Sequence, residues 1–221
     1  MKRYKLYLFD LDGTLIDSDQ MLIETFRELY SIHRPDYHPS DDYIRTFSGP
    51  PIAETLQKEF PMLDQNAILA EYKERSRKFY DKCVHLFPNA IDVIEKLYKN
   101  NIPFGVITNK HRYATIYTYG ILDLEKYNIY SVCADDVKHL KPHEEGILKA
   151  MHDFGIKNKD DVIYIGDSTF DYLSASNAGV KFGYVAWSPR VIKGQVKIDE
   201  IIQSYAEFAK EIWIWKKLIS L

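Results

Sequence analysis

The chain has 221 residues, which is enough for one large domain or for a core with a smaller insert. Its residues are 46% hydrophobic and 28% charged, as in a globular protein with a buried core, and its net charge of −3 gives no general attraction to nucleic acid or to an acidic membrane. No apolar run is long enough to cross a bilayer. We therefore expect a cytoplasmic protein, a monomer or homodimer, with no nucleic-acid or membrane partner.

The first expected element is a short apolar strand over residues 4–9, which ends at the acidic pair Asp10 and Asp12. The pattern then turns helical and more charged. Leu22, Phe26 and Leu29 share one face of a first helix with Tyr30. Further helices are expected over 51–60 and 66–80, and the prolines in residues 31–42 predict a loop between the first and second helices.

After Pro88 the chain alternates between helices and strands. Gly120 is expected to end one helix, Pro142 to begin the next, and Gly179 to end a third. In chain order we expect a helix over 89–100 with Ile91, Ile94, Leu97 and Tyr98 inward, a strand over 102–108, a helix over 111–120, a strand over 129–134, a helix over 142–154, a strand over 161–166, a helix over 169–179, a strand over 182–187 and a helix over 199–221.

This alternation predicts the fold class. Strands that alternate with helices form βαβ units, and these build an α/β, doubly wound parallel sheet. The helical block interrupts the alternation after the first strand. We therefore expect a Rossmann-like core over 1–15 and 88–221, with an all-α helical cap inserted over 16–87.

Polar side chains follow the expected strands, where a parallel sheet places its ligands. Asp10 and Asp12 follow the first strand, and Thr108, Asn109 and Lys110 follow the second. The later loops add Lys141, Asp167 and Asp171.

These residue types predict chemistry on a phosphoryl group. Clustered carboxylates favour a hard cation such as Mg²⁺ beside Asp10 and Asp167, with Lys141 and the Thr108 hydroxyl as anion ligands. Asp10 can then attack phosphorus as a nucleophile. The nearby charge of Asp10 is expected to raise the pKa of Asp12, which suits general acid–base catalysis.

Four segments together resemble the haloacid dehalogenase superfamily, and its phosphoglycolate phosphatase group in particular. They are "DLDGT" from Asp10, "TNK" from Thr108, the Lys141–Pro142 pair, and "GDSTFD" from Gly166. The resemblance implies an Mg²⁺-dependent phosphatase of small phosphorylated metabolites with a phospho-aspartyl intermediate. One departure is Glu144, where glycolate-type enzymes usually carry a second proline.

The resemblance also implies a role for each matching residue. Asp10 is the nucleophile and a metal ligand, while Asp12 is the acid–base and offers its backbone carbonyl to the metal. Asp167 binds the metal and Asp171 supports it from outside. Lys141 is catalytic and also holds the phosphate. Thr108 and Asn109 bind the phosphate as well, and Lys110 is expected to bind substrate beside them.

Other functions stay open at this point. A β-phosphoglucomutase-like phosphomutase shares the same four segments, a pyrophosphatase is a close alternative, and a non-catalytic binding protein on the same core is a third.

Substrate choice is expected to lie in the helical block. There Ser48 and Gly49 lead into a helix N-terminus, and Arg45 offers a fork for an anion, although these residues are equally consistent with an ordinary helix start and a solvated charge.

Cysteines and histidines give no further site in the sequence. Cys83 and Cys133 show no metal-ligand spacing and are expected to be reduced thiols, and the seven histidines show no ligand spacing either. Trp213 and Trp215 are expected to pack on the terminal helix or to form a dimer patch.

Overall fold

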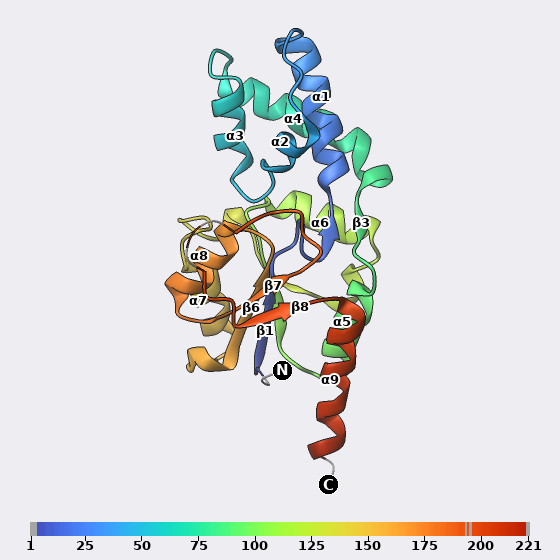
Figure 1. Cartoon of the computed structure of the whole chain (residues 1–221), viewed down its shortest axis with the longest axis vertical. Coiled ribbons are helices and arrows are strands. Elements are labelled where there is room, and N and C mark those ends of the chain that lie inside the picture. The colour runs from blue at the N-terminus through green and yellow to red at the C-terminus, as the bar shows by residue number, and fades with distance from the viewer. Residues whose placement is uncertain (1–3, 193, 195, 220–221) are drawn as a thin grey trace. The chain divides into compact units, whose positions relative to one another are not determined.

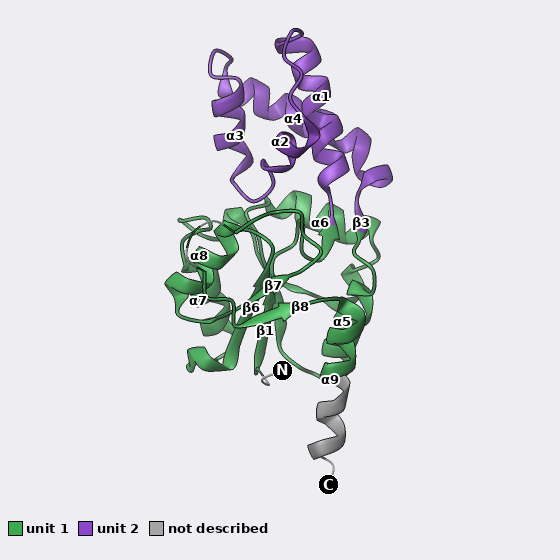
Figure 2. Cartoon of the chain, in the orientation of Figure 1, with its two compact units in different colours: residues 1–16, 86–221 green, residues 17–85 purple. Residues whose placement is uncertain are grey.

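The computed structural model describes residues 4–192, 194 and 196–219, with side chains as far as residue 212 (Figure 1). Within this part the chain divides into two compact units (Figure 2). The core unit consists of Met1–Ile16 and Leu86–Leu221, and the helical unit of Asp17–His85. The prediction for Trp213 and Trp215 concerns side chains that lie outside the described residues.

The core unit is built on a parallel sheet, as the sequence predicts. Its described residues form one six-stranded sheet in the order β5-β4-β1-β6-β7-β8, and every neighbouring pair is parallel. The strands are β1 (Leu6–Phe9), β4 (Phe104–Ile107), β5 (Tyr130–Val132), β6 (Val162–Gly166), β7 (Lys181–Val185) and β8 (Glu200–Ile202). Since β1 lies between β4 and β6, the loop that follows it reaches the middle of the sheet edge.

Helices cover both faces of this sheet, which confirms the α/β Rossmann-like fold (Figure 1). Helices α7 and α8 pack together beside the sheet, and α5 packs against α9. The bounds are α5 (Ala90–Lys99), α6 (Arg112–Ile121), α7 (Glu145–Asp153), α8 (Thr169–Ala178) and α9 (Tyr205–Ile219). Short 3₁₀ helices lie at Glu125–Tyr127, Ala134–Asp136 and Lys159–Asp161. Leu8 and Tyr164 in the sheet pack with Ile147 of α7 and Ala175 of α8 in one buried cluster, which fixes these helices on the strands.

Several element predictions are corrected here. Gly120 does not end its helix, because α6 continues to Ile121 and the left-handed residue beyond it is Asp123, with φ 54°. Pro142 lies before α7 rather than in its first turn: residues 140–143 form a turn in which His143 N–H donates to Leu140 O at 2.9 Å. Gly179 does end α8, with φ 74°.

Two further predictions are wrong: the buried face of the helix over 89–100, and the helix over 199–221. The buried face of α5 is Ala90, Val93, Ile94 and Leu97, so Ile91 is only half-buried and Tyr98 is exposed. The stretch 199–221 is not all helix. Its first residues form β8, a short edge strand paired with β7, before α9 begins at Tyr205.

The helical unit contains α1 (Asp19–His33), α2 (Asp41–Arg45), α3 (Ile52–Glu59) and α4 (Gln65–Cys83). The expected face of α1 is buried, and Phe26 packs against Phe47 and Tyr72. Helix α2 was not predicted, since its five residues are too few for a periodic pattern. The chain enters the unit through β2 (Ile16–Asp17) and leaves through β3 (His85–Leu86), and these two strands pair.

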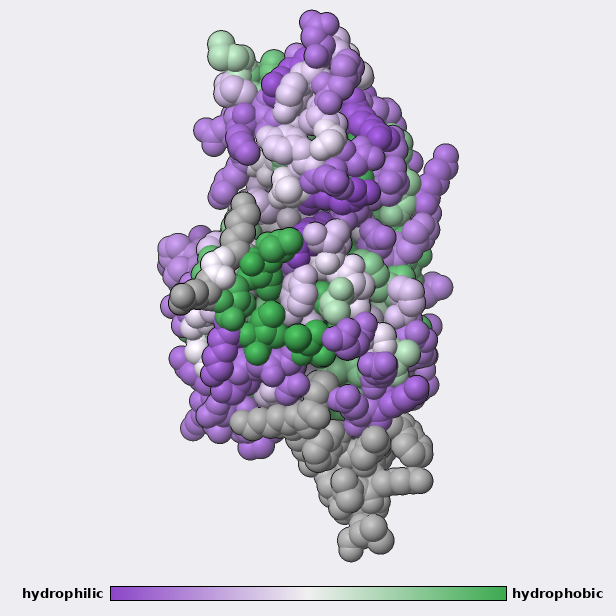
Figure 3. All heavy atoms as spheres, in the orientation of Figure 1, coloured by the Kyte–Doolittle hydropathy of each residue, from purple (hydrophilic) through white to green (hydrophobic). Residues whose placement is uncertain are grey.

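The surface of the core unit carries an apolar region. Figure 3 shows hydrophobic residues gathered on the face where Figure 1 places β7 and β8. On the described chain near these strands, Val191 is 81% and Ile201 is 55% exposed. Among the described helices, none combines the length and hydropathy that a membrane span needs.

Candidate active site

The loops after β1 and β6 and the start of α8 bring three carboxylates together. Asp10, Asp167 and Asp171 are at most 3% exposed, and one carboxylate oxygen from each lies within 4.8 Å of the others. Strand pairing explains the proximity, because Phe9 lies opposite Ile165 and the next residues of both strands face the same edge. The three carboxylates therefore lie together, as their positions after the expected strands predict.

Lys141 bridges two of these carboxylates. Its Nζ atom donates to Oδ1 of Asp10 at 2.6 Å, to Oδ1 of Asp171 at 2.7 Å and to the Tyr164 hydroxyl at 3.1 Å. Burial alone would lower the pKa of Lys141, but the charges of Asp10 and Asp171 outweigh it and raise the pKa. Lys141 is therefore a fixed positive charge beside Asp10.

Negative charge is in excess in this cluster. Burial raises the pKa of Asp10 well above its usual value, and the neighbouring Asp171 and Asp167 raise it further against the opposing effect of Lys141. Burial also raises the pKa of Asp167 to about 6, although Arg190 works against it. Asp171 behaves differently: burial would raise its pKa, but the Lys141 charge and several hydrogen bonds lower it.

Arg190 and Ser188, which follow β7, were missed by the sequence analysis. Arg190 Nη1 lies 2.7 Å from Asp167 Oδ2, and the Ser188 hydroxyl donates to the same oxygen at 2.9 Å. The signal was present, because β7 is also a parallel strand and its carboxyl end meets the same edge of the sheet.

The donor set suits a hard divalent cation. In the described part of the cluster, the three carboxylates outnumber the two cations Lys141 and Arg190 that touch them. Oxygen ligands of this kind are what Mg²⁺ takes in proteins. Asp171 is already committed, since Oδ2 accepts from the Ser168 hydroxyl at 2.6 Å and Oδ1 from Lys141 and Tyr164. Asp10 and Asp167 are therefore the carboxylates better able to bind the cation directly.

Gly13 lies against this cluster in a conformation that requires glycine. Its φ is +86°, and a Cβ atom there would lie 2.2 Å from Asp167 Oδ2 and 2.8 Å from Arg190 Nη1. The close approach of the backbone to Asp167 explains why a glycine follows the second aspartate of "DLDGT".

Asp12 is paired with Lys110. The Lys110 Nζ atom donates to Asp12 Oδ1 at 2.7 Å, and both side chains are less than 20% exposed. The sequence analysis expected Asp10 to disfavour the charged form of Asp12 and placed Lys110 on the phosphate. In the structure the ammonium of Lys110 lies on Asp12, and both expectations stay predictions.

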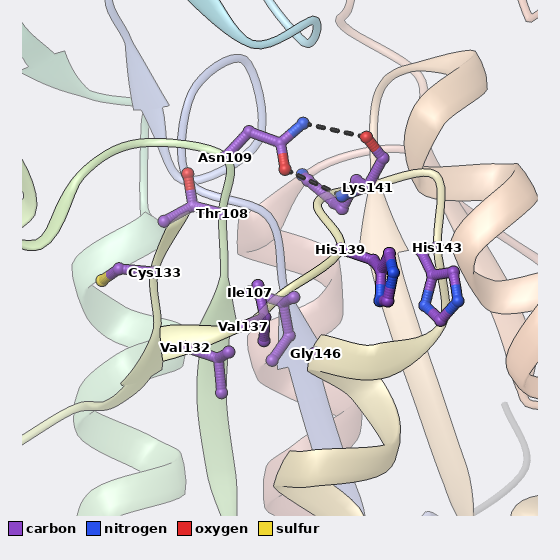
Figure 4. Close-up of a pocket in the computed structure, with 10 residues that line it drawn as sticks. All are labelled: Ile107, Thr108, Asn109, Val132, Cys133, Val137, His139, Lys141, His143 and Gly146. Carbon is purple, nitrogen blue, oxygen red and sulfur yellow. Dashed lines mark hydrogen bonds between the residues drawn. The ribbon is translucent and has the colours of Figure 1, made fainter. Parts of the chain in front are cut away.

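Asn109 holds the backbone of Lys141 at both ends. Its Oδ1 accepts from Lys141 N–H at 2.9 Å, and its Nδ2 donates to Lys141 O at 3.2 Å (Figure 4). The Thr108 hydroxyl accepts from Lys110 N–H at 3.1 Å, and Thr108 is buried. A cavity of about 10 Å³ beside these residues has room for roughly one water molecule.

Tyr164 and Ser168 complete the support of the cluster, and neither was predicted. The buried Tyr164 hydroxyl donates to Asp171 Oδ1 at 2.9 Å or to Ile107 O at 3.0 Å. Ser168 and Asp171 form a capping box at the start of α8. The spacing Ser168-x-x-Asp171 is the known signal of such a box and could have identified Ser168.

Three predicted site residues, Arg45, Ser48 and Gly49, belong to the helical unit. Arg45 Nη1 pairs with Asp42 Oδ1 at 2.6 Å, and its Nε lies 3.9 Å from Asp19 Oδ2. Ser48 and Gly49 precede α3, and Gly49 has φ 109°. Their predicted contact with substrate remains a prediction.

The chain matches several known proteins. Residues 7–185 match the family model described as haloacid dehalogenase-like hydrolase. A protein of Oceanobacillus iheyensis named pyrophosphatase PpaX is 30% identical over 82% of this chain and 83% of its own length. A structure from Bacteroides fragilis, assigned provisionally as a haloacid dehalogenase-like hydrolase, is 27% identical with a TM-score of 0.81, and covers 93% of this chain and 100% of its own. A predicted phosphoglycolate phosphatase of Haemophilus somnus shares the fold, with a TM-score of 0.79 and 20% identity. The match covers 96% of this chain and 99% of that structure.

Proposed function

The chain belongs to the haloacid dehalogenase-like hydrolase family, and on this premise we propose that it is an Mg²⁺-dependent phosphatase of small phosphorylated metabolites. One observation carries the proposal: Lys141 Nζ bridges Asp10 and Asp171 in a buried cluster that includes Asp167. A nucleophilic carboxylate, a fixed cation and a metal-binding carboxylate are the groups that phosphoryl transfer needs in one place.

Asp10 performs the first chemical step. A carboxylate oxygen of Asp10 attacks phosphorus and forms a P–O bond while the bond from phosphorus to the leaving oxygen breaks. Asp12 donates a proton to that oxygen, and the product is a phospho-aspartyl group and an alcohol. Water then attacks phosphorus as Asp12 takes its proton, which releases phosphate and restores Asp10.

The remaining residues hold these groups in position. Lys141 offsets the charge of the phosphoryl oxygens, and Asn109 fixes the Lys141 backbone. Asp10, Asp167 and the carbonyl of Asp12 would hold Mg²⁺, with Asp171 as support, and the cation would supply further charge neutralisation. The Thr108 hydroxyl and the ammonium of Lys110 are the additional groups proposed for the phosphate.

The substrate class has a specific second candidate. The relative from Oceanobacillus iheyensis is named a pyrophosphatase. Inorganic pyrophosphate is therefore a candidate substrate in addition to phosphate monoesters. In pyrophosphate the leaving group is itself an anion. Attack by Asp10 would release one phosphate, and hydrolysis of the phospho-aspartyl group would release the second. A phosphomutase of the β-phosphoglucomutase kind remains the third reading of the same residues.

Phosphate release from a panel of sugar phosphates, phosphoglycolate and pyrophosphate tests the proposal. A phosphatase releases phosphate from at least one monoester, a pyrophosphatase prefers pyrophosphate, and a mutase converts a sugar phosphate to its isomer with little release.

Activity should vanish in EDTA and return with Mg²⁺. The Asp10→Asn variant should fold but lose nearly all turnover, since its amide cannot attack phosphorus; retention of a tenth of the activity would exclude the covalent route.

We place substrate selection in the helical unit, as a proposal that rests on Arg45. Its guanidinium offers two donors to a carboxylate or second phosphate. Arg45→Ala should raise KM for the best anionic substrate and leave kcat on p-nitrophenyl phosphate nearly unchanged. Arg27→Ala is the matched control, because Arg27 also pairs with an acidic residue of this unit, Asp41 at 2.7 Å. Equal effects of Arg45→Ala on both substrates would remove it from the specificity site.

A further inference from the structure

A second cluster of metal-ligating side chains lies on the loop that carries Lys141. It consists of His139, His143 and Glu145, and one ligand atom from each lies within 4.8 Å of the other two. The cluster is separate from the acidic cluster of Asp10, Asp167 and Asp171, because no residue is shared. Figure 4 shows the two imidazole rings side by side near the start of α7.

The loop is folded so that these groups converge. His139 Nδ1 lies 2.9 Å from Glu145 Oε2, and the Glu145 carboxylate also accepts from the backbone N–H groups of Lys138 at 2.8 Å and His139 at 3.0 Å. His143 Nδ1 accepts from Glu145 N–H at 3.1 Å and lies 3.8 Å from Glu144 Oε2. The two rings stack with centroids 4.5 Å apart.

Two imidazoles and one carboxylate form a ligand set for Zn²⁺, Co²⁺ or Ni²⁺, whereas Mg²⁺ favours oxygen alone. We infer that His139, His143 and Glu145 form a binding site for a divalent transition-metal ion. Two ligands that each lie about 2.1 Å from one ion are about 3.0 Å apart when they meet at a right angle and about 3.4 Å apart at the tetrahedral angle. The 2.9 Å between His139 Nδ1 and Glu145 Oε2 is close to the first of these separations. The ion would replace the hydrogen bond between them, and His143 would exchange its bond from Glu145 N–H for the third position.

The surroundings allow an ion to enter. The side chains of His139, His143 and Glu145 are 63%, 44% and 31% exposed, so solvent reaches the site and water can fill the remaining positions. Two acidic side chains, Glu144 and Glu145, offset the positive charge of the bound ion. No ligand spacing among the histidines is predicted from the sequence. In the structure the turn over residues 140–143 brings His143 to His139.

An ion at this site would restrain the loop on both sides of Lys141. His139 lies two residues before Lys141 and His143 two residues after it, so a shared ion ties the two flanks together. Binding to the folded chain would therefore raise its melting temperature by mass action.

The site can be tested with Co²⁺ titrated into the full chain without a histidine tag, in excess Mg²⁺ to saturate the acidic cluster. Calorimetry and the visible absorption spectrum of Co²⁺ report stoichiometry and ligand type. We expect one Co²⁺ per chain, a higher Tm, and a loss of affinity of at least about tenfold in both His139→Ala and His143→Ala. Glu145→Gln should weaken binding as well.

Matched variants separate this site from general surface binding. His152→Ala is the control, since His152 also lies beside a carboxylate, with Nδ1 3.0 Å from Asp153 Oδ1, yet is outside the cluster. Cys83→Ser removes the half-exposed thiol as an alternative ligand. Absence of Co²⁺ binding in Mg²⁺, or equal binding by wild type and both histidine variants, would overturn the inference. His139→Gln keeps a polar side chain, so a loss of Co²⁺ in this variant at unchanged metal-free Tm excludes unfolding as the cause. Activity is not the readout, so the result does not depend on the proposed phosphatase function.

Discussion

Arg190 and the proposed metal ligand Asp167 form a buried ion pair, in which Arg190 Nη1 lies 2.7 Å from Asp167 Oδ2. The side chains are 11% and 2% exposed, so water screens the pair only weakly. A metal ion held by Asp167 therefore has to share this carboxylate with the guanidinium or displace it. This relationship connects the loop after β7 to cation binding.

The Arg190→Gln variant should bind Mg²⁺ more tightly than wild type, because the competing charge is removed. A tenfold lower Kd, about 1.4 kcal/mol, is the expected scale. The same change removes the cation beside Asp167 and leaves the Ser188 hydroxyl bonded to it, so the metal-free protein should lose up to about 3 kcal/mol of stability. Calorimetry with Mg²⁺ and melting in EDTA measure the two effects.

Arg27→Gln is the control for this experiment, since it removes a guanidinium from an exposed pair in the helical unit. It should change neither quantity by more than about 1 kcal/mol. Weaker Mg²⁺ binding by Arg190→Gln would show that the arginine assists the cation instead of competing with it.

Gly13→Ala should reduce both stability and Mg²⁺ binding. The left-handed backbone at φ +86° costs a non-glycine residue about 1–2 kcal/mol, and the new Cβ would also lie 2.2 Å from Asp167 Oδ2. Gly155→Ala isolates the first effect, because Gly155 has φ +68° and nothing within 4 Å of an added Cβ. Urea unfolding and Mg²⁺ titration of both variants measure the difference. Equal losses of stability with unchanged Mg²⁺ affinity would contradict a tight contact at Gly13.

Tyr164→Phe should destabilise the core by about 1–3 kcal/mol and lower kcat. The change removes the hydroxyl that bonds Lys141 Nζ and Asp171 Oδ1, and it leaves buried polar groups with one partner fewer. Tyr119→Phe is the comparison, since the Tyr119 hydroxyl lies 2.9 Å from Ser131 Oγ, and Ser131 keeps its bond to Ile129 O. Unfolding curves and steady-state rates of both variants provide the measurement. A kcat for Tyr164→Phe equal to that of Tyr119→Phe would argue against a positioning role.

Mg²⁺ binding should weaken as the pH falls through about 6. Burial and neighbouring carboxylates raise the pKa of Asp10, and burial raises the pKa of Asp167 to about 6, so protons compete with the cation in this range. In the metal-free protein both groups bind protons more tightly when folded than when unfolded. Their ionisation therefore destabilises the folded state, and this contribution is relieved as the pH falls from 7 toward 5.

Melting temperatures in EDTA and in Mg²⁺ at pH 5.5, 6.5 and 7.5 test this dependence. The increase in Tm due to Mg²⁺ should shrink toward low pH in wild type, and Asp167→Asn should remove most of it at every pH. An increase that is the same at all three values would mean that these carboxylates do not bind the cation.

The sequence predicts the fold and the grouping of Asp10, Lys141, Asp167 and Asp171 for one physical reason. Parallel strands send their carboxyl ends to a common edge, so reading the residues after each strand finds side chains far apart in the chain. The same rule applies to Ser188 and Arg190, which follow β7 and were not predicted.

What the sequence does not reveal depends on tertiary contacts. Gly120 resembles a helix end, yet α6 continues through it and Asp123 takes the left-handed conformation instead. Lys110 resembles an anion ligand, and only the folded loop places its ammonium on Asp12. The buried face of α5 begins at Ala90 rather than Ile91, because a small residue contacts the core where a periodicity count favours the larger one.

The central position of β1 has a consequence for the order of folding during synthesis. β1 leaves the ribosome before its partners β4 and β6, which begin only at Phe104 and Val162. The helical unit, Asp17–His85, is translated entirely within this interval, and its packing contacts between α1 and α4 are internal to it. This unit can therefore fold while the nascent β1 still lacks a sheet, and the apolar segment LYLF must stay protected until β4 has emerged.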